Sequence, residues 1–257
     1  MTGAESDALV SPQTFLATGD ARPPAARLGV AVVRDLVSAI VTGEVAAGSF
    51  LPPEGDLCTH FGVSRTVIRE SVKRIEEKGL VRVEHGRGTT VQPSTSWNIL
   101  DPVVLSALAD NDDSLGFLDQ LAVVRTALEG SMSAQAATLR TDAQLAELTT
   151  ALERMRTSLH DRDAFQQADA DFHGLVMTMS GNLLAASMTK ILFDRARESA
   201  RFTGNATEAA FALSLSEHQG VLEAIAAGHP ADAEARMRSH IIDAWERRRG
   251  YAAPRLP

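Results

Sequence analysis

Residues 54–79 constrain the fold most strongly, because two short helical patterns follow each other there with a tight turn between them. The first pattern, residues 54–61, ends at Gly62, a residue type that readily takes the left-handed conformation of a helix end. Ser64 is a good N-cap for the second pattern, which ends at Gly79. The second pattern has an apolar side made of Val67, Ile68, Val72 and Ile75.

The flanking segments extend this pair of helices in both directions. Before it, apolar residues recur at three- and four-residue intervals from Ala25 to Gly43, which predicts an amphipathic helix. After it, Leu80 to Val83 and Val91 flank the stretch "EHGRGTT", which predicts two short strands around a glycine turn. A helix, a helix-turn-helix and a hairpin in this order predict a winged helix-turn-helix, whose second short helix enters the DNA major groove.

The exposed side of the second short helix carries candidate DNA-reading residues. Arg65 and Thr66 lie in its first turn and Arg69 lies one turn further along, so all three project from the same end. Arginine makes bidentate contacts to guanine, threonine contacts a phosphate or a thymine methyl group, and amides at a helix N-terminus favour phosphate. For any one of these residues alone, the alternative is an ordinary solvated helix face.

The charge distribution permits DNA binding, although the whole chain carries a net charge of −8. Residues 25–92 contain nine Lys and Arg against eight Asp and Glu, which is +1, whereas residues 93–257 contain fifteen against twenty-two, which is −7. An acidic body repels phosphate and would restrict which face of the protein approaches a duplex. The asymmetry fits a DNA reader joined to a domain with another task.

The 257 residues are enough for two domains, and we expect a cytoplasmic protein with no membrane segment. A single cysteine, Cys58, excludes an internal disulfide. The predicted parts are a flexible tail (1–24), the winged helix-turn-helix domain (25–92), a turn-rich linker (93–102) and an all-α antiparallel bundle (103–250). The bundle helices are expected at 103–109, 114–139, 142–159, 162–179, 183–202, 208–227 and 230–249. The fold class is therefore mainly α.

Polar residues on the core-facing side of the bundle helices are candidate ligands, because a buried polar group needs a partner. Asp169 and His173 lie one helical turn apart, and His218 and His240 lie on the last two predicted helices with apolar neighbours at helical spacing. One carboxylate and three imidazoles would hold a divalent transition metal, zinc first, with nickel or manganese as alternatives. Taken singly, these residues also fit a surface pair and structural core histidines.

Two arginines on apolar helix stripes, Arg125 and Arg195, are candidate contacts for an anionic ligand. A buried cation needs an anion, and a guanidinium matches a carboxylate bidentately. This pattern favours a small carboxylate effector that binds the metal at one end and arginine at the other. The alternatives are an internal ion pair, such as Arg125 with Glu129, or side chains that extend to the surface.

The segment "GSFLPPEGDLCTHFGVSRTVIRESVKRIEEKGLVRVEHGRGTTV" resembles the winged helix-turn-helix of the GntR family of regulators. The resemblance implies that Arg65, Thr66 and Arg69 contact operator DNA from the recognition helix. It also implies contacts from His85 and Gly86 at the wing tip. Family members commonly carry arginine or lysine after the Pro-x-Glu, where this chain has Gly55, so one expected DNA contact is missing or replaced.

Two later stretches, "DADFHGLVMTMSGNLL" and "EHQGVLEAIAAGHPADAEARMRSHI", resemble the FCD ligand-binding domain of the FadR-like branch of this family. Many members of that branch bind a metal through an aspartate and three histidines, which here fall on Asp169, His173, His218 and His240. Fatty-acyl-sensing members lack this set. The linker "WNILDPVVL" is similar to a stretch of sugar-acid regulators, which ranks aldonates first among effectors without excluding hydroxy acids or dicarboxylates.

The sequence therefore predicts a homodimeric transcription regulator, a repressor that a small organic acid releases from a palindromic operator. The alternative from another class is a metal-dependent hydrolase of a small ester or lactone. Its only obvious base candidates are Glu217 and Glu223, and no HExxH or serine-elbow motif occurs. An architectural DNA-binding protein is disfavoured by the acidic C-terminal region.

Overall fold

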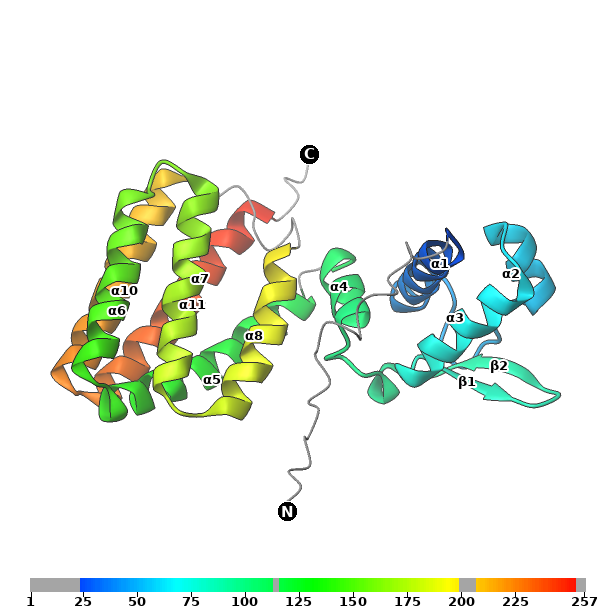
Figure 1. The fold of residues 1–257 in the computed structure, drawn as a ribbon, viewed down its shortest axis with the longest axis horizontal. Coiled ribbons are helices and arrows are strands. Elements are labelled where there is room, and N and C mark those ends of the chain that lie inside the picture. The colour runs from blue at the N-terminus through cyan, green and yellow to red at the C-terminus, as the bar shows by residue number, and fades with distance from the viewer. Residues whose placement is uncertain (1–23, 113–115, 199–206, 253–257) are drawn as a thin grey trace, which may run out of the picture. The chain divides into compact units, whose positions relative to one another are not determined.

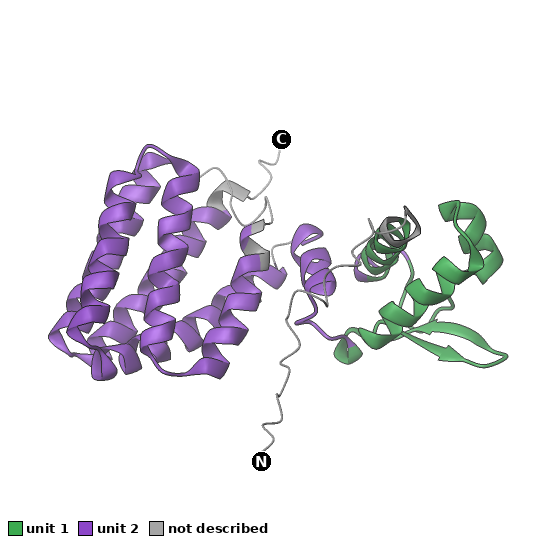
Figure 2. Ribbon diagram, in the orientation of Figure 1, with its two compact units in different colours: residues 1–40, 45–96 green, residues 41–44, 97–257 purple. Residues whose placement is uncertain are grey.

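The structure is a computed structural model, and it describes residues 24–112, 116–198 and 207–252. The chain divides into two compact units (Figure 2). Unit 1 comprises residues 1–40 and 45–96, and unit 2 comprises residues 41–44 and 97–257, of which the described residues are considered below. None of the helices in the described ranges is long and apolar enough to cross a membrane.

Unit 1 contains three helices and a two-stranded hairpin (Figure 1): α1 (Pro24–Val41), α2 (Glu54–Phe61), α3 (Arg65–Glu77), β1 (Val81–Glu84) and β2 (Gly88–Val91). Gly62 ends α2 in the left-handed conformation, at φ 64°. The hydroxyl of Ser64 accepts a hydrogen bond from the Val67 amide and caps α3. Ile68 and Ile75 of α3 are fully buried, so the predicted apolar side of this helix forms the core of the unit.

The hairpin is the predicted wing. Strands β1 and β2 pair antiparallel, with Val81 opposite Val91 and Glu84 opposite Gly88. The turn between them uses Gly86, at φ 76°, a conformation that side-chain-bearing residues rarely adopt. The Glu76 carboxylate at the end of α3 accepts a hydrogen bond from the amide of Val83, which ties the recognition helix to the wing.

Unit 2 is a bundle of helices: α4 (Pro102–Asp110), α5 (Gly116–Leu139), α6 (Asp142–Thr157), α7 (Arg162–Met179), α8 (Leu183–Glu198), α10 (Glu208–Ala227) and α11 (Pro230–Ala252). A short 3-10 helix, η2 (Ser94–Ser96), lies within the predicted linker. The mainly α fold with a small hairpin agrees with the predicted fold class. Each helix overlaps a predicted one, although residues 113–115 and 199–206 lie outside the described ranges.

The core of the bundle is built by α5, α6, α7, α10 and α11, with Phe172 of α7 and Met237 of α11 fully buried. Helix α11 packs along both α5 and α10 (Figure 1). Its close approach to α5 depends on Gly130, since a Cβ at that position would lie 2.6 Å from Cγ of Arg238. This packing brings residues of α5, α7, α10 and α11 to a common polar cluster inside the bundle.

Candidate metal centre and DNA-facing surface

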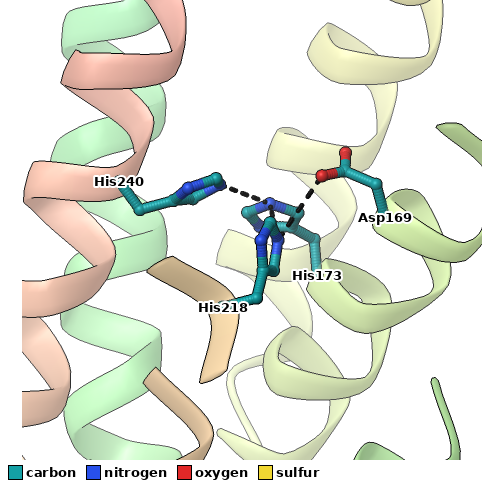
Figure 3. Close-up of side chains that lie close together, drawn as sticks. All are labelled: Asp169, His173, His218 and His240. Carbon is teal, nitrogen blue, oxygen red and sulfur yellow. Dashed lines mark hydrogen bonds and ion pairs between the residues drawn. The ribbon is translucent and has the colours of Figure 1, made fainter. Parts of the chain in front are cut away.

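The four predicted metal ligands come together inside the bundle (Figure 3). Helix α7 supplies Asp169 and His173 from consecutive turns, α10 supplies His218, and α11 supplies His240. One ligand atom from each residue lies within 4.8 Å of the others. All four side chains are buried, with exposed fractions of 6, 1, 0 and 3% in that order.

The contacts within the cluster join ring nitrogens to each other. Nε2 of His173 lies 3.2 Å from Nε2 of His218 and 3.3 Å from Nε2 of His240. Nε2 of His218 lies 3.4 Å from Oδ1 of Asp169. The three Nε2 atoms and one carboxylate oxygen therefore face a common point.

The opposite nitrogen of each ring faces an oxygen acceptor. Nδ1 of His218 donates to the Ser214 backbone carbonyl over 2.7 Å. Nδ1 of His240 donates to Oε2 of Glu217 over 2.8 Å. Nδ1 of His173 lies 2.7 Å from Oε2 of Glu129.

These partners define where the ring protons are. A carbonyl or a carboxylate accepts but does not donate, so a proton belongs on the Nδ1 that faces it. Burial lowers the pKa of His218 to about 4. Burial is also the main cause that brings the pKa of His240 well below its usual value, and repulsion from His218 is the next largest cause. Both rings are then neutral at pH 7 and carry no proton on Nε2. The bare lone pairs of two imidazoles point at His173 Nε2, where at most one proton is available.

This cluster lacks enough protons to satisfy its acceptors, and a cation at the common point would satisfy them. Neutral imidazole Nε2 atoms and a carboxylate are the donors that zinc and related divalent metals bind, and anchoring the far ring nitrogen fixes both tautomer and orientation. The residues present therefore fit a metal. The donor set does not distinguish zinc from nickel or manganese.

Two buried carboxylates keep their negative charge in this environment. Burial alone would raise the pKa of Asp169, but the nearby His173 and His218 lower the pKa well below its usual range. Burial also acts to raise the pKa of Glu129, and the charges of Arg125 and His173 outweigh it in the same way. An anionic Asp169 is ready to bind a cation, and the anionic Glu129 places a negative charge 2.7 Å from Nδ1 of His173.

The helices that carry the ligands are held by apolar packing around the cluster. The ring of Phe172 meets that of His218 edge to face, with centroids 4.7 Å apart. N-caps fix the starts of two of these helices: Asp161 accepts from the Ala164 amide on α7, and Thr207 accepts from the Ala210 amide on α10. The imidazoles are therefore set by rigid elements and not by loops.

The two predicted effector arginines have different outcomes. Arg125 is buried and its Nε donates to Oε1 of Glu129 over 2.7 Å, while its guanidinium carbon lies 3.8 Å from the ring centre of Phe193. This is the internal ion pair considered as the alternative from sequence, and it orients the carboxylate that faces His173. The side chain of Arg195 lies outside the described residues.

A small cavity beside Asp169 is lined by two other arginines, Arg247 and Arg248, together with Gln166 and Ser214. Burial lowers the pKa of Arg248 to about 10, against the opposing attraction of Asp169, so the side chain remains a cation at neutral pH. Sequence reasoning missed both arginines. The available signal was that Arg247 follows His240 by two helical turns and therefore shares its side of α11.

The predicted DNA-contact residues of unit 1 are all exposed. Arg65, Thr66 and Arg69 are exposed on α3, and His85 and Gly86 are exposed at the wing tip. A groove between α3 and the wing is lined by Arg69, Lys73, His85, Gly86 and Arg87, among others. Gly55 is exposed at the start of α2, and a Cβ added there would meet nothing within 4 Å, so the position has room for the basic side chain that family members commonly carry.

Comparison with known families assigns both units. Residues 28–91 match the family described as bacterial regulatory proteins, gntR family, and residues 120–243 match the FCD domain. The galactonate operon transcriptional repressor of Escherichia coli K12 is 31% identical over 194 residues, which is 76% of this chain and 85% of the relative. This chain belongs to the GntR family. It is a transcriptional regulator of the GntR type with an FCD domain, as predicted.

Other relatives agree with this assignment. The regulator LutR of Bacillus subtilis is 29% identical over 82% of this chain and 97% of its own length. The repressor NanR of Klebsiella aerogenes is 29% identical over 86% of this chain and 85% of its own length. A solved structure titled as Lar, which controls the agr system of Listeria monocytogenes, has a TM-score of 0.57 at 18% identity, covers 86% of this chain and 96% of its own, and shows a similar fold. The relatives are regulators, so the hydrolase alternative has no support.

Proposed function

We propose that this protein is a transcriptional repressor that binds a palindromic operator as a homodimer and is released by a small organic acid. Relatives named as a galactonate operon repressor and as NanR repressors support the sign of regulation. The observation that carries the sensing half is the convergence of Asp169 and three Nε2 atoms beside a cavity lined by Arg247 and Arg248.

The proposed metal ligands are Asp169, His173, His218 and His240, with zinc as the first candidate and nickel and manganese as alternatives. When bound, the metal would supply a positive charge that attracts an oxygen ligand in the cavity. The chain's own contribution is to hold three imidazole rings with their Nε2 atoms facing that point, beside Ser214, Glu217 and Glu129. These anchors reduce the reorganisation that binding requires.

The proposed effector is a carboxylate, with sugar acids such as aldonates first and hydroxy acids such as lactate second. Arg247 and Arg248 line the cavity and are placed to pair with it. These two arginines add to the effector contact proposed from the sequence for Arg125, whose guanidinium also contacts Glu129 and Phe193. Arg195 retains the role proposed from the sequence.

Effector binding would act on DNA by shifting the balance between two conformations of the dimer. In one of these conformations, the distance between the two recognition helices does not match the distance between the two half-sites. An effector that stabilises this conformation weakens operator binding. The recognition residues in this scheme are Arg65, Thr66 and Arg69 on α3, with His85 and Gly86 on the wing.

The test begins with two measurements. The metal content of the purified protein is determined, and the protein is then used to select the DNA that it binds from a random pool of sequences. We expect stoichiometric bound metal and a short palindrome. A gel shift with that DNA is then titrated with D-galactonate, D-gluconate and L-lactate. Release by one of these acids from metal-loaded wild type, and loss of the response in Arg248→Gln, would support the proposal. Metal-free protein, or no release across a broad set of carboxylates, would reject the sensing half.

The hydrolase alternative can be tested with the same preparations. Glu217 is engaged by both His240 and Arg247, and Glu223 is exposed and accepts from Gln219, so neither carboxylate is placed as a base over the cluster. We therefore expect no turnover of small esters or lactones by metal-loaded protein. Turnover that His218→Ala abolishes would overturn this expectation.

A further inference from the structure

Arg247 takes part in two structures at once. It lines the cavity beside Asp169, and its guanidinium also holds Glu217 through two hydrogen bonds, from NH1 to Oε1 and from NH2 to Oε2, each of 2.7 Å. The side chains of Arg247 and Glu217 are both 23% exposed. A forked contact of this kind fixes the direction of the carboxylate as well as its position.

The same carboxylate orients a candidate metal ligand. Oε2 of Glu217, which accepts from Arg247, also accepts from Nδ1 of His240 over 2.8 Å. The order Arg247, Glu217, His240 is therefore a continuous chain of hydrogen bonds from the cavity to Nδ1 of His240, the ring nitrogen opposite the candidate metal ligand Nε2. Displacing the arginine would leave Glu217 free to rotate, and His240 would lose its fixed acceptor.

The other two histidines are anchored differently. His218 donates to the backbone carbonyl of Ser214, which cannot rotate away from the helix. Nδ1 of His173 faces the carboxylate of Glu129, which is paired with Arg125. Both of these side chains lie deep in the bundle: Glu129 is 1% exposed and Arg125 is 6% exposed. Of the three imidazoles, His240 alone has an anchor that is held by a cavity-lining side chain, as far as the described residues show.

We propose that Arg247 is a positioning residue that sets the metal affinity of the cluster through Glu217 and His240, and that a carboxylate in the cavity increases metal affinity through it. The inference rests on the metal site of the proposed function. The guanidinium has further donor hydrogens beyond the two that hold Glu217. A carboxylate bound to them would restrain Arg247 and hence the whole chain of contacts, so metal and anion binding would reinforce each other reciprocally.

The first experiment measures zinc affinity by competition with a chromophoric chelator, without any organic acid. Arg247→Gln is expected to bind zinc about 10-fold more weakly than wild type, since removing partners that orient metal ligands costs about that much or more. Arg249→Gln is the matched control, because it removes the same charge from the same helix, while its side chain pairs with Asp119 and does not line the cavity. The control is expected to bind zinc as tightly as wild type, whereas losing the positive charge of Arg247 would by itself favour a cation.

The sign of the effect therefore separates positioning from charge. Unchanged or tighter zinc binding by Arg247→Gln would overturn the inference, and so would equal weakening in Arg249→Gln. Thermal unfolding of the metal-free variants identifies a folding defect, and the visible spectrum of bound Co²⁺ reports the ligand geometry independently of affinity. We expect the Co²⁺ spectrum to change in Arg247→Gln and to stay as in wild type in Arg249→Gln.

A double-mutant cycle with Glu217→Gln tests the path. If Arg247 acts through Glu217, the double variant Glu217→Gln/Arg247→Gln binds zinc no more weakly than the weaker single variant. Additive losses would mean that the two residues act separately, which would overturn the proposed chain of contacts.

The anion arm repeats the zinc titration with D-galactonate at a concentration that saturates the wild type. Zinc affinity is expected to rise in wild type, and the rise is expected to shrink in Arg247→Gln. If the acid releases DNA but leaves zinc affinity unchanged, the anion part of the inference is wrong. Failure of wild type to bind zinc would instead reject the proposed metal site, and failure of carboxylates to bind would reject only the proposed effector.

Discussion

Arg69 of α3 is paired with Glu54 of α2, with Nε 3.0 Å from each carboxylate oxygen. The pair is exposed, with side chains 67 and 43% accessible, so it contributes little to stability. Its effect is on position, because the contact engages Nε of a side chain that lines the groove between α3 and the wing. The two terminal nitrogens of the guanidinium are the groups that would donate hydrogen bonds to O6 and N7 of a guanine.

Replacing Arg69 should therefore weaken operator binding. We expect Arg69→Ala to cost about 1–3 kcal/mol in affinity for the selected operator, measured by fluorescence anisotropy at fixed salt. Arg74→Ala is the control, because Arg74 is exposed on the same helix but does not line the groove. Equal losses in the two variants would indicate a general charge effect and would contradict a role in base recognition.

Removing the metal should destabilise the bundle. At a free zinc concentration 1,000 times the dissociation constant, bound zinc contributes about 4 kcal/mol to the folded state, and a chelator abolishes that contribution. We expect the chelator to lower the melting temperature of wild type and to leave that of His218→Ala unchanged. His160→Ala, which replaces a histidine whose side chain is 81% exposed, should respond like wild type. A chelator shift that persists in His218→Ala would contradict the assigned ligand set.

Acid should destabilise the metal-free protein through His218. The folded pKa of His218 is lowered from 6.5 to about 4 by burial, so between these pH values the unfolded chain binds more protons than the folded one. Stability is therefore lost as the pH falls from about 6.5 toward 4. From pH 7 to pH 5 we expect wild type to lose about 1–2 kcal/mol more than His218→Gln, measured by urea unfolding with chelator present. The same loss in both proteins would contradict a neutral, buried His218.

Gly130 should be required for the packing of α11 on α5. A Cβ there would lie 2.6 Å from Cγ of Arg238, near the base of that side chain, so the helices would have to move apart. We expect Gly130→Ala to destabilise the bundle by about 1–3 kcal/mol in urea unfolding. Gly174→Ala on α7 is the control: its Cβ would meet nothing within 4 Å, and replacing a helical glycine there should stabilise by about 0.5–1 kcal/mol. Two stabilised variants would show that α11 accommodates the extra methyl group.

The fold was predictable to the extent that local signals determine it. Helices α7 and α10 span the predicted residues 162–179 and 208–227, because Asp161, Thr207 and Gly228 act as caps with clear local preferences. In the winged domain, the turns at Gly62 and Gly86 likewise depend on backbone conformations that glycine adopts readily.

The site was predictable only in part. The pairing of Asp169 with His173 follows from helical periodicity. Apolar neighbours at helical spacing indicated that His218 and His240 also face the interior, but it was the family resemblance that strengthened their assignment to the same set, since separations along the chain carry no geometry. The anchors of the rings were harder still to predict. Whether Glu129 faces His173, and whether Arg247 reaches Glu217, depends on how α5, α10 and α11 pack together.

The four candidate metal ligands come from α7, α10 and α11, and this distribution bears on the order of events during synthesis. His173 and His218 are 45 residues apart in sequence, and His173 and His240 are 67 apart. A ribosome that has completed α7 and α10 has produced three of the four ligands, without the ring that α11 contributes. Full loading of the proposed site would therefore mark a bundle whose last helix has already docked, so that a metal held by all four residues would be acquired only after the tertiary structure has formed.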